Sequence, residues 1–262
     1  MKPAFIDTHC HFDFPPFSGH EAESLRLAAE AGVKQVIVPA VEASRFEKIL
    51  RLAKEHGALF AALGLHPICI SSHTDSCLEQ LDEQLGGRHE KLVAIGETGL
   101  DLYMENPDFD KQQRLLNAQF ALAKKYHLPL ILHSRRTHDK LAAMLRKVSL
   151  PATGVVHGFA GSLSQAEAFV RLGFAIGVGG TITYERAQKT RQVMAKLPLT
   201  SLLLETDAPD MPLQGFQGQP NRPERAALVF ASLCELREES PKHIADALQE
   251  NARRVFNLPK LS

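Results

Sequence analysis

Short apolar runs alternate with amphipathic stretches along this chain, and that alternation constrains the fold more than any other feature. Strands are predicted at Ala4–Ile6, Gln35–Pro39, Leu59–Gly64, Leu92–Gly96, Pro129–Leu132, Gly154–Val156, Phe174–Gly177 and Leu202–Leu204. Helices are predicted at Glu21–Ala31, Asp110–Lys125, Ser162–Leu172, Pro223–Arg237 and Pro241–Phe256. Strands that alternate with helices are typical of βα units in a parallel sheet. Eight such strands in 262 residues predict an α/β fold, a (β/α)₈ TIM-type barrel forming a single domain over residues 1–262.

An open, doubly wound parallel sheet is the alternative fold. Its dinucleotide-binding form carries a GxGxxG motif after the first strand, but here Thr8, His9, Cys10 and His11 follow that strand. The segment 209–223 contains four prolines and two glycines, so we expect a loop there.

Composition excludes several classes of protein. Thirty Lys and Arg balance 30 Asp and Glu, which argues against the broad basic face of a protein that coats nucleic acid. The longest apolar runs are too short to span a membrane, and the N-terminus becomes polar too early for a signal peptide. The four cysteines form no CxxC pair, which disfavours a disulfide framework or a thiolate zinc site. We therefore expect a cytoplasmic protein, without an obligatory protein partner.

Chemically active side chains follow the predicted strands. The segments concerned are His9–His11, His66–Pro67, Glu97–Asp101, His133–Arg135, His157–Phe159 and Glu205–Asp207. In a parallel barrel the carboxyl ends of the strands meet at one mouth, where catalytic residues are usually found. The sequence therefore predicts that histidines and carboxylates from six strands converge there.

The residue types at these positions indicate metal binding. His9 and His11 are two residues apart, so along a strand they would point the same way and could hold one ion. Glu97, following a buried run, would need a cation or hydrogen bonds, and a carboxylate can bridge two ions. His133 and His157 would supply a second nitrogen-rich site, and Asp207 ends the last strand. Each also has a structural alternative: surface or core histidines, a loop glutamate and a turn-forming aspartate.

Imidazoles and carboxylates without thiolates suit zinc, manganese, iron or magnesium. Such ions, with open positions for water, indicate hydrolysis. His66 and Arg135 are weaker candidates for substrate binding, because His66 could merely end a strand and Arg135 could be solvated. The remaining histidines at positions 73, 89, 127 and 138 are expected at the surface, and Cys10 is expected to pack in the interior.

Six motifs in order resemble the TatD family of metal-dependent deoxyribonucleases, within the amidohydrolase superfamily. They are FIDTHCHFD at 5–13, GLHP at 64–67, GETGLD at 96–101, PLILHSR at 129–135, VVHGF at 155–159 and LLETDAP at 203–209. The resemblance covers nearly the whole chain. The sequence HGFAG at 157–161, where many relatives have HCFSG, and the loop after Pro209 depart from the family pattern, which affects the expected substrate preference.

The resemblance implies a barrel with two divalent metal ions, zinc being expected ahead of manganese or magnesium. His9, His11 and Asp207 would hold the first ion, Glu97 would bridge, and His133 and His157 would hold the second. Asp207 would also orient the attacking water or accept its proton, so Asp207 and Glu97 are the expected catalytic residues.

Three functions follow as hypotheses. The leading one is a deoxyribonuclease that cleaves phosphodiester bonds of DNA, binding it with modest affinity because the net charge is zero. The second is a hydrolase with the same site acting on a small ester, lactone, amide or phosphoester. The third is a non-catalytic binding module stabilised by metal, which the open ligand set disfavours.

Overall fold

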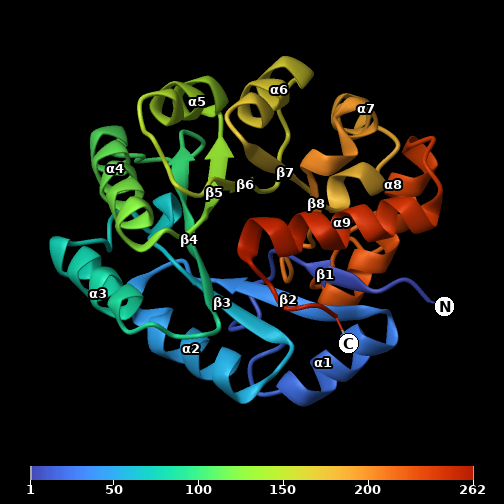
Figure 1. Cartoon of the computed structure of the whole chain (residues 1–262), viewed down its shortest axis with the longest axis horizontal. Coiled ribbons are helices and arrows are strands. Elements are labelled where there is room, and N and C mark those ends of the chain that lie inside the picture. The colour runs from blue at the N-terminus through green and yellow to red at the C-terminus, as the bar shows by residue number, and fades with distance from the viewer. Residues whose placement is uncertain (1, 262) are drawn as a thin grey trace.

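The computed structural model describes residues 2–261, and its strands form one parallel sheet in the order β1 to β8 (Figure 1). The strands are β1 (Phe5–Asp7), β2 (Val33–Pro39), β3 (Leu59–Leu63), β4 (Leu92–Asp101), β5 (Leu130–Arg135), β6 (Gly154–Val156), β7 (Phe174–Val178) and β8 (Leu202–Leu204). The sheet closes just beyond β1 and β8, where Cys10 pairs in parallel with Ala208 and the Thr8 N–H donates to the Leu204 carbonyl at 3.0 Å. The predicted (β/α)₈ barrel is confirmed.

Helices surround the sheet (Figure 1). The α-helices are α1 (Glu21–Glu30), α2 (Phe46–Glu55), α3 (Asp75–Gly86), α4 (Phe109–Tyr126), α5 (His138–Arg146), α6 (Leu163–Arg171), α7 (Gln188–Lys196), α8 (Ala226–Leu236) and α9 (Pro241–Phe256). Short 3₁₀ turns are η1 (Ala43–Arg45), η2 (Pro67–Cys69), η3 (Gly180–Thr183), η4 (Leu199–Ser201) and η5 (Pro223–Arg225). Among the helices of residues 2–261, none combines the length and apolar character that crossing a membrane requires.

The ends of the predicted helices agree with local capping chemistry. Ser162 accepts a hydrogen bond from the Gln165 N–H, and the Gln165 side chain bonds back to the Ser162 N–H, which completes a capping box before α6. Ser240 caps α9, whose first residue is Pro241. The helix predicted from Pro223 begins instead as the turn η5, and α8 starts at Ala226.

Two strands extend at least three residues past their predicted carboxyl ends. β4 continues past Gly96 to Asp101, and β5 continues past Leu132 to Arg135. The extensions pair with each other, with Gly99 opposite His133 and Asp101 opposite Arg135. The apolar runs in the sequence end before the strands do, because the last residues of β4 and β5 include polar side chains. The backbones of these residues still pair.

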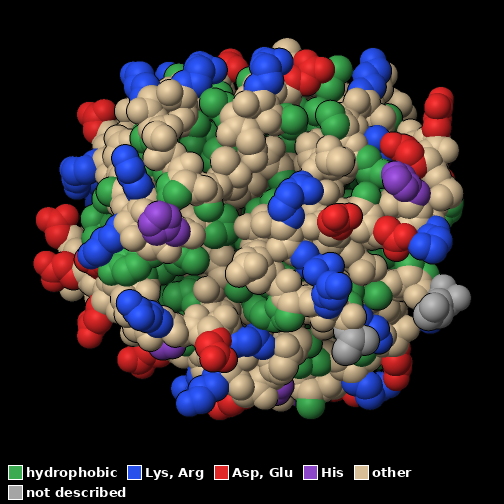
Figure 2. Space-filling model, viewed as in Figure 1, with side chains coloured by type: hydrophobic (Ala, Val, Ile, Leu, Met, Phe, Trp, Pro, Cys, Tyr) green, Lys and Arg blue, Asp and Glu red, His purple; other side chains and the backbone are tan. Residues whose placement is uncertain are grey.

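Alternate strand residues pack into two apolar clusters. On β3, Leu59, Ala61 and Leu63 pack outward against the helices, whereas Phe60 and Ala62 point into the barrel. The inner cluster, called the floor, consists of Ile6, Ile37, Phe60, Ala62, Val93, Ala94, Ile131, Val155, Ala175, Leu203, Ala252, Phe256 and Leu258. Its last three members belong to α9 and the residues after it, and Figure 1 shows α9 lying across this end of the barrel. The space-filling view from the same side shows both signs of charge scattered over this face (Figure 2).

Candidate metal centre

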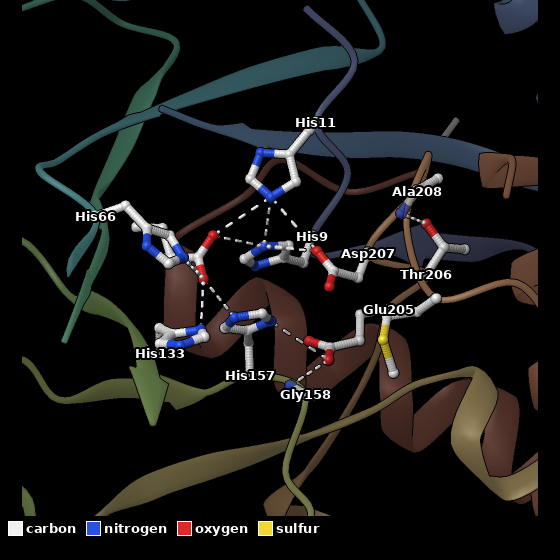
Figure 3. Close-up of polar contacts among 12 residues, drawn as sticks. His9, His11, His66, His133, His157, Gly158, Glu205, Thr206, Asp207 and Ala208 are labelled. Atoms are coloured by element: carbon white, nitrogen blue, oxygen red, sulfur yellow. Dashed lines mark hydrogen bonds and ion pairs between the residues drawn. The ribbon is translucent and has the colours of Figure 1, made fainter. Parts of the chain in front are cut away.

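A cavity of about 640 Å³ opens at the carboxyl ends of the strands, opposite the floor. We call it the mouth, and it is lined by residues that include His11, Phe14, Val41, His66, Ile68, Glu97, Asp101, His133, Arg135, His157, Phe159, Glu205, Asp207 and Met211. Most of the residues expected from sequence to bind metal or substrate line this one cavity. Figure 3 shows the side chains of five histidines and one aspartate pointing toward one another: His9, His11, His66, His133, His157 and Asp207.

The first group of ligands joins the two ends of the barrel sheet. The Nε2 atoms of His9 and His11 lie 3.3 Å apart, and each lies 3.4 Å from Oδ1 of Asp207. Backbone hydrogen bonds hold the two segments together, since the Asp207 N–H donates to the His9 carbonyl and the His11 N–H donates to the Ala208 carbonyl, both at 2.8 Å. The structure therefore places the side chains of His9, His11 and Asp207 in contact with one another, as predicted.

Glu97 lies at the centre of the site. The pairing of β4 with β5 is irregular between Ile95 and Thr98, so Glu97 sits in a bulge, and its N–H donates instead to the Ala40 carbonyl at 2.9 Å. Its carboxylate is 1% exposed and contacts five imidazoles. Oε2 lies 3.1 Å from His9 and 3.3 Å from His11, and Oε1 lies 3.0 Å from His66, 3.3 Å from His133 and 2.5 Å from His157.

His66 is buried inside the site and does not merely end a strand at the surface. Its ligand atom lies within 4.8 Å of those of Glu97 and His133, so the three could geometrically hold an ion. However, the Nδ1 atom of His66 accepts a hydrogen bond from the Ile68 N–H at 2.9 Å. A neutral imidazole that accepts at Nδ1 carries its proton at Nε2. His66 therefore faces Oε1 of Glu97, 3.0 Å away, with an N–H donor and not a lone pair, which suits a hydrogen bond to an oxygen atom better than metal ligation.

The surrounding histidines keep the central carboxylates ionised. Burial opposes ionisation of Glu97, but His157, His66 and His9 outweigh it and hold the pKa of Glu97 well below its usual value. Burial also opposes ionisation of Asp207, whose pKa is nevertheless lowered by the hydrogen bond with His11 and by His9 nearby. Both side chains are therefore available as anionic ligands at neutral pH.

His11 and His66 favour opposite protonation states. Burial disfavours the charged form of His11, yet its hydrogen bonds to Asp207 and Glu97 raise its pKa to about 10. For His66 burial prevails over the attraction of Glu97 and lowers the pKa to about 4. A metal ion at His9, His11 and Asp207 would have to displace the His11 proton, whereas His66 stays a neutral donor.

The donor set fits divalent metal ions. Within residues 2–261, the Nε2 atom of His157 is buried, faces Oε1 of Glu97 in the centre of the site and makes no hydrogen bond. Buried polar groups are rarely left without partners unless a ligand, ion or water is absent. Four imidazoles and two ionised carboxylates without a thiolate match zinc, manganese or magnesium chemistry. The residues present therefore fit the metal-dependent site expected from the sequence.

The structure places the other expected residues as follows. Arg135, at the exposed end of β5, lines the mouth with its guanidinium 3.7 Å from the ring centre of Tyr103. His89 and His127 are exposed and Cys10 is buried, as expected. The surface prediction is wrong for His73, which is 2% exposed and donates from Nε2 to the His66 carbonyl at 2.7 Å. It is also wrong for His138, which is half-buried against Phe159.

Two carboxylates in the site had no role in the sequence-based assignment. Asp101 contacts His133, and Glu205 contacts His157 and accepts a hydrogen bond from the Gly158 N–H. Both are buried, and Glu205 directly follows the apolar run Leu202–Leu204, a signal like the one that identified Glu97, whereas Asp101 is separated from its apolar run by Glu97–Leu100. The sequence does not show which carboxylate contacts the outer edge of an imidazole, because that depends on how neighbouring strands align.

Comparisons with known proteins agree with this geometry. Residues 6–257 match the family described as "TatD related DNase". The chain is 65% identical to the "Uncharacterized metal-dependent hydrolase YjjV" of Escherichia coli K12, over 97% of this chain and 98% of that protein. The crystal structure of that TatD homologue superposes with a TM-score of 0.97, covering 99% of this chain and 100% of that chain. The chain is also 32% identical to the "3'-5' ssDNA/RNA exonuclease TatD" of Erwinia tasmaniensis, over 92% of this chain and 95% of that protein.

Proposed function

This chain belongs to the TatD family of metal-dependent hydrolases, and from that premise we propose that it is a deoxyribonuclease that hydrolyses phosphodiester bonds with two divalent ions. His9, His11 and Asp207 would hold one ion, Glu97 would bridge, and His133 and His157 would hold the other. The observation that carries the proposal is the position of Glu97, with one carboxylate oxygen toward each group of histidines. Zinc is our first choice of metal, ahead of manganese or magnesium.

The side chains of the site can perform the steps that metal-dependent hydrolysis requires. Bound divalent ions would lower the pKa of a water molecule and polarise a phosphoryl oxygen. Asp207 is ionised and partly exposed to the cavity, so it can orient the attacking water and accept a proton from it. His66 lines the same cavity with its Nε2–H 3.0 Å from Oε1 of Glu97, and with Glu97 binding the ions this N–H would be available to donate to a phosphate oxygen.

Three residues at the edge of the mouth, which we call the rim, favour a nucleic acid substrate: Tyr103, Arg135 and Arg136. Arg135 lies over the ring of Tyr103, and the guanidinium of Arg136 lies 4.4 Å from the same ring centre. Guanidinium groups bind phosphate, and exposed aromatic rings stack on unpaired bases. Tyr103 is 52% exposed, so its position allows both contacts beside the catalytic cavity. The Erwinia relative is named an ssDNA/RNA exonuclease, which agrees with this proposal.

The neutral net charge limits how many phosphates the protein can contact. With 30 basic and 30 acidic residues, we expect modest affinity for DNA and a shallow dependence on salt. The apolar part of the lining, which includes Phe14, Val41 and Ile68, supports a small ester or phosphoester as the second candidate substrate. Such a substrate would use the same ligands and the same Asp207.

The test is hydrolysis of an end-labelled single-stranded oligonucleotide and of a panel of small esters and phosphoesters, each with zinc, manganese or magnesium. We expect wild type to cleave the oligonucleotide and E97Q to lose at least about a thousandfold in rate, about 4 kcal/mol in activation free energy. E97Q keeps the side-chain volume but removes the negative charge of the carboxylate that contacts both groups of histidines. Metal content of both proteins is measured in parallel.

The other outcomes separate the alternatives. Cleavage of small esters alone, by a wild type that binds two ions, would overturn the DNA assignment and keep the metal site. A wild type that unfolds when metal is removed and hydrolyses no substrate would support a metal-stabilised binding module instead.

A further inference from the structure

One carboxylate at the mouth bonds the outer nitrogen of a proposed metal ligand. Oδ2 of Asp101 lies 2.7 Å from Nε2 of His133, while Nδ1 of His133 lies 3.3 Å from Glu97 in the centre of the site. The pair comes from neighbouring strands, β4 and β5, whose extended ends place Gly99 opposite His133. A Cβ on Gly99 would lie 1.9 Å from the His133 carbonyl, so glycine permits this close approach.

The Asp101 carboxylate is itself held in place. Its Oδ1 atom accepts a hydrogen bond from the Tyr103 N–H at 2.8 Å. The buried side chain of Gln112, on α4, accepts from the Asp101 N–H at 2.8 Å and donates to the Asp101 carbonyl at 2.9 Å. With backbone and Oδ1 both bonded, Oδ2 is the oxygen left to face the imidazole.

We propose that Asp101 is a positioning residue that keeps the proton of His133 on Nε2, so that the Nδ1 lone pair faces the metal site. A neutral imidazole has one N–H and one lone pair, and a carboxylate can only accept, so Asp101 selects the tautomer with Nε2 protonated. Carboxylates that bond the outer nitrogen of a metal-binding histidine orient the ring and increase its affinity for the ion. The inference rests on the proposed metal site, in which His133 is a ligand.

The isosteric variant D101N should reverse the tautomer. Its amide oxygen would keep the bond from the Tyr103 N–H, because that position requires an acceptor. Its NH₂ group would then face Nε2 of His133 and could only donate, so the ring proton would move to Nδ1 and block the lone pair. D101A lacks any group there and leaves both tautomers accessible. We therefore expect D101N to weaken metal binding more than D101A does, although D101N is the smaller change in shape.

The experiment titrates the chelator-treated full chain with zinc ions, measuring affinity by calorimetry and the number of ions by elemental analysis. For one of the two ions we expect a loss of about 10- to 100-fold in D101N and a smaller loss in D101A. In parallel, ¹⁵N-histidine NMR of the metal-free proteins, recorded at a pH above the raised pKa of His133, reports which ring nitrogen of the neutral imidazole carries the proton, a signal that lost packing alone would not reverse. D82N is the matched control, since Asp82 accepts a hydrogen bond from the Tyr126 hydroxyl far from the cavity.

Each outcome decides the inference. Zinc affinity unchanged in D101N, a loss in D101A equal to or larger than that in D101N, or an unchanged tautomer in D101N would overturn it. A wild type that binds no zinc would instead overturn the proposed function on which it rests. If D101N does not fold, the affinity and the mixed tautomer of D101A still test the role of the carboxylate.

Discussion

The two ends of the barrel are built from the same strands, yet they are chemically opposite. At the floor, inward residues such as Ile37, Phe60 and Ile131 meet Phe256 of α9 in an apolar cluster. At the mouth, the continuation of the strands presents Glu97 and Asp207 among buried histidines. Burial of apolar surface stabilises the floor, whereas burial of charged groups opposes folding at the mouth.

This difference between the floor and the mouth indicates which end of the barrel contributes most to the stability of the fold. The floor consists of apolar side chains that pack on one another, so its stability requires no bound ligand. The mouth gathers ionised carboxylates and imidazoles with unpartnered nitrogens, so it gains stability when cations bind. We therefore expect stability to depend mainly on the floor, and activity to depend on the mouth.

The largest effect on stability is expected from F256A. Phe256 is 1% exposed and fills the barrel end beneath α9, so truncation should lower the free energy of unfolding by about 3–5 kcal/mol. Urea unfolding measures the loss, with L228A on the exposed side of α8 as control. Metal stoichiometry should be unchanged. A variant as stable as wild type would show that packing of Phe256 in the floor contributes little to stability.

The next effect is expected from metal addition. Zinc at 100 times its dissociation constant should raise the free energy of unfolding by about 2.7 kcal/mol, because ions bind the folded site. Thermal unfolding with and without chelator measures this for wild type, F256A and E97Q. We expect F256A to gain as much as wild type and E97Q to gain much less. An equal gain in E97Q would contradict a central role for Glu97.

A smaller effect is expected at the rim of the mouth. R135A should raise the KM for a single-stranded oligonucleotide about tenfold, about 1.4 kcal/mol, because a guanidinium contact to phosphate is lost. Turnover of a small phosphoester should change little, since that substrate does not reach the rim. R146A, at the exposed end of α5, is the matched control. Equal losses on both substrates would place Arg135 in the chemistry rather than in binding DNA.

The smallest effect is expected away from both ends. The hydrogen bonds from Tyr126 and Lys125 hold the pKa of Asp82 below its usual value. A lowered folded-state pKa stabilises the protein above the unfolded pKa, and the gain is lost as pH falls through the folded value. D82N should therefore lose up to about 1 kcal/mol at pH 7, and the difference should shrink between pH 5 and pH 3. A difference independent of pH would rule out the charge as its cause.

Much of the barrel could be predicted from the sequence, because period-two apolar runs and helical stripes are local signals. α9 is found at the predicted residues, Pro241–Phe256, since Pro241 and the cap at Ser240 define its start. The ends of β4 and β5 could not be predicted, because their polar residues pair only when the neighbouring strand is in register. Likewise, His73 is buried by a loop that folds back on the His66 carbonyl, a contact without a local signature.

The sequence by itself determined the alternation of strands and helices and the placement of histidines and carboxylates at the strand ends, because both follow from residue type and spacing along the chain. Only the tertiary structure decided which nitrogen of each imidazole faces the cavity, that Glu97 contacts both groups of histidines, and that Asp101 lies behind His133. The physical reason is that these contacts depend on the bulge in β4, on the register of neighbouring strands and on barrel closure. Those features join residues far apart in the sequence.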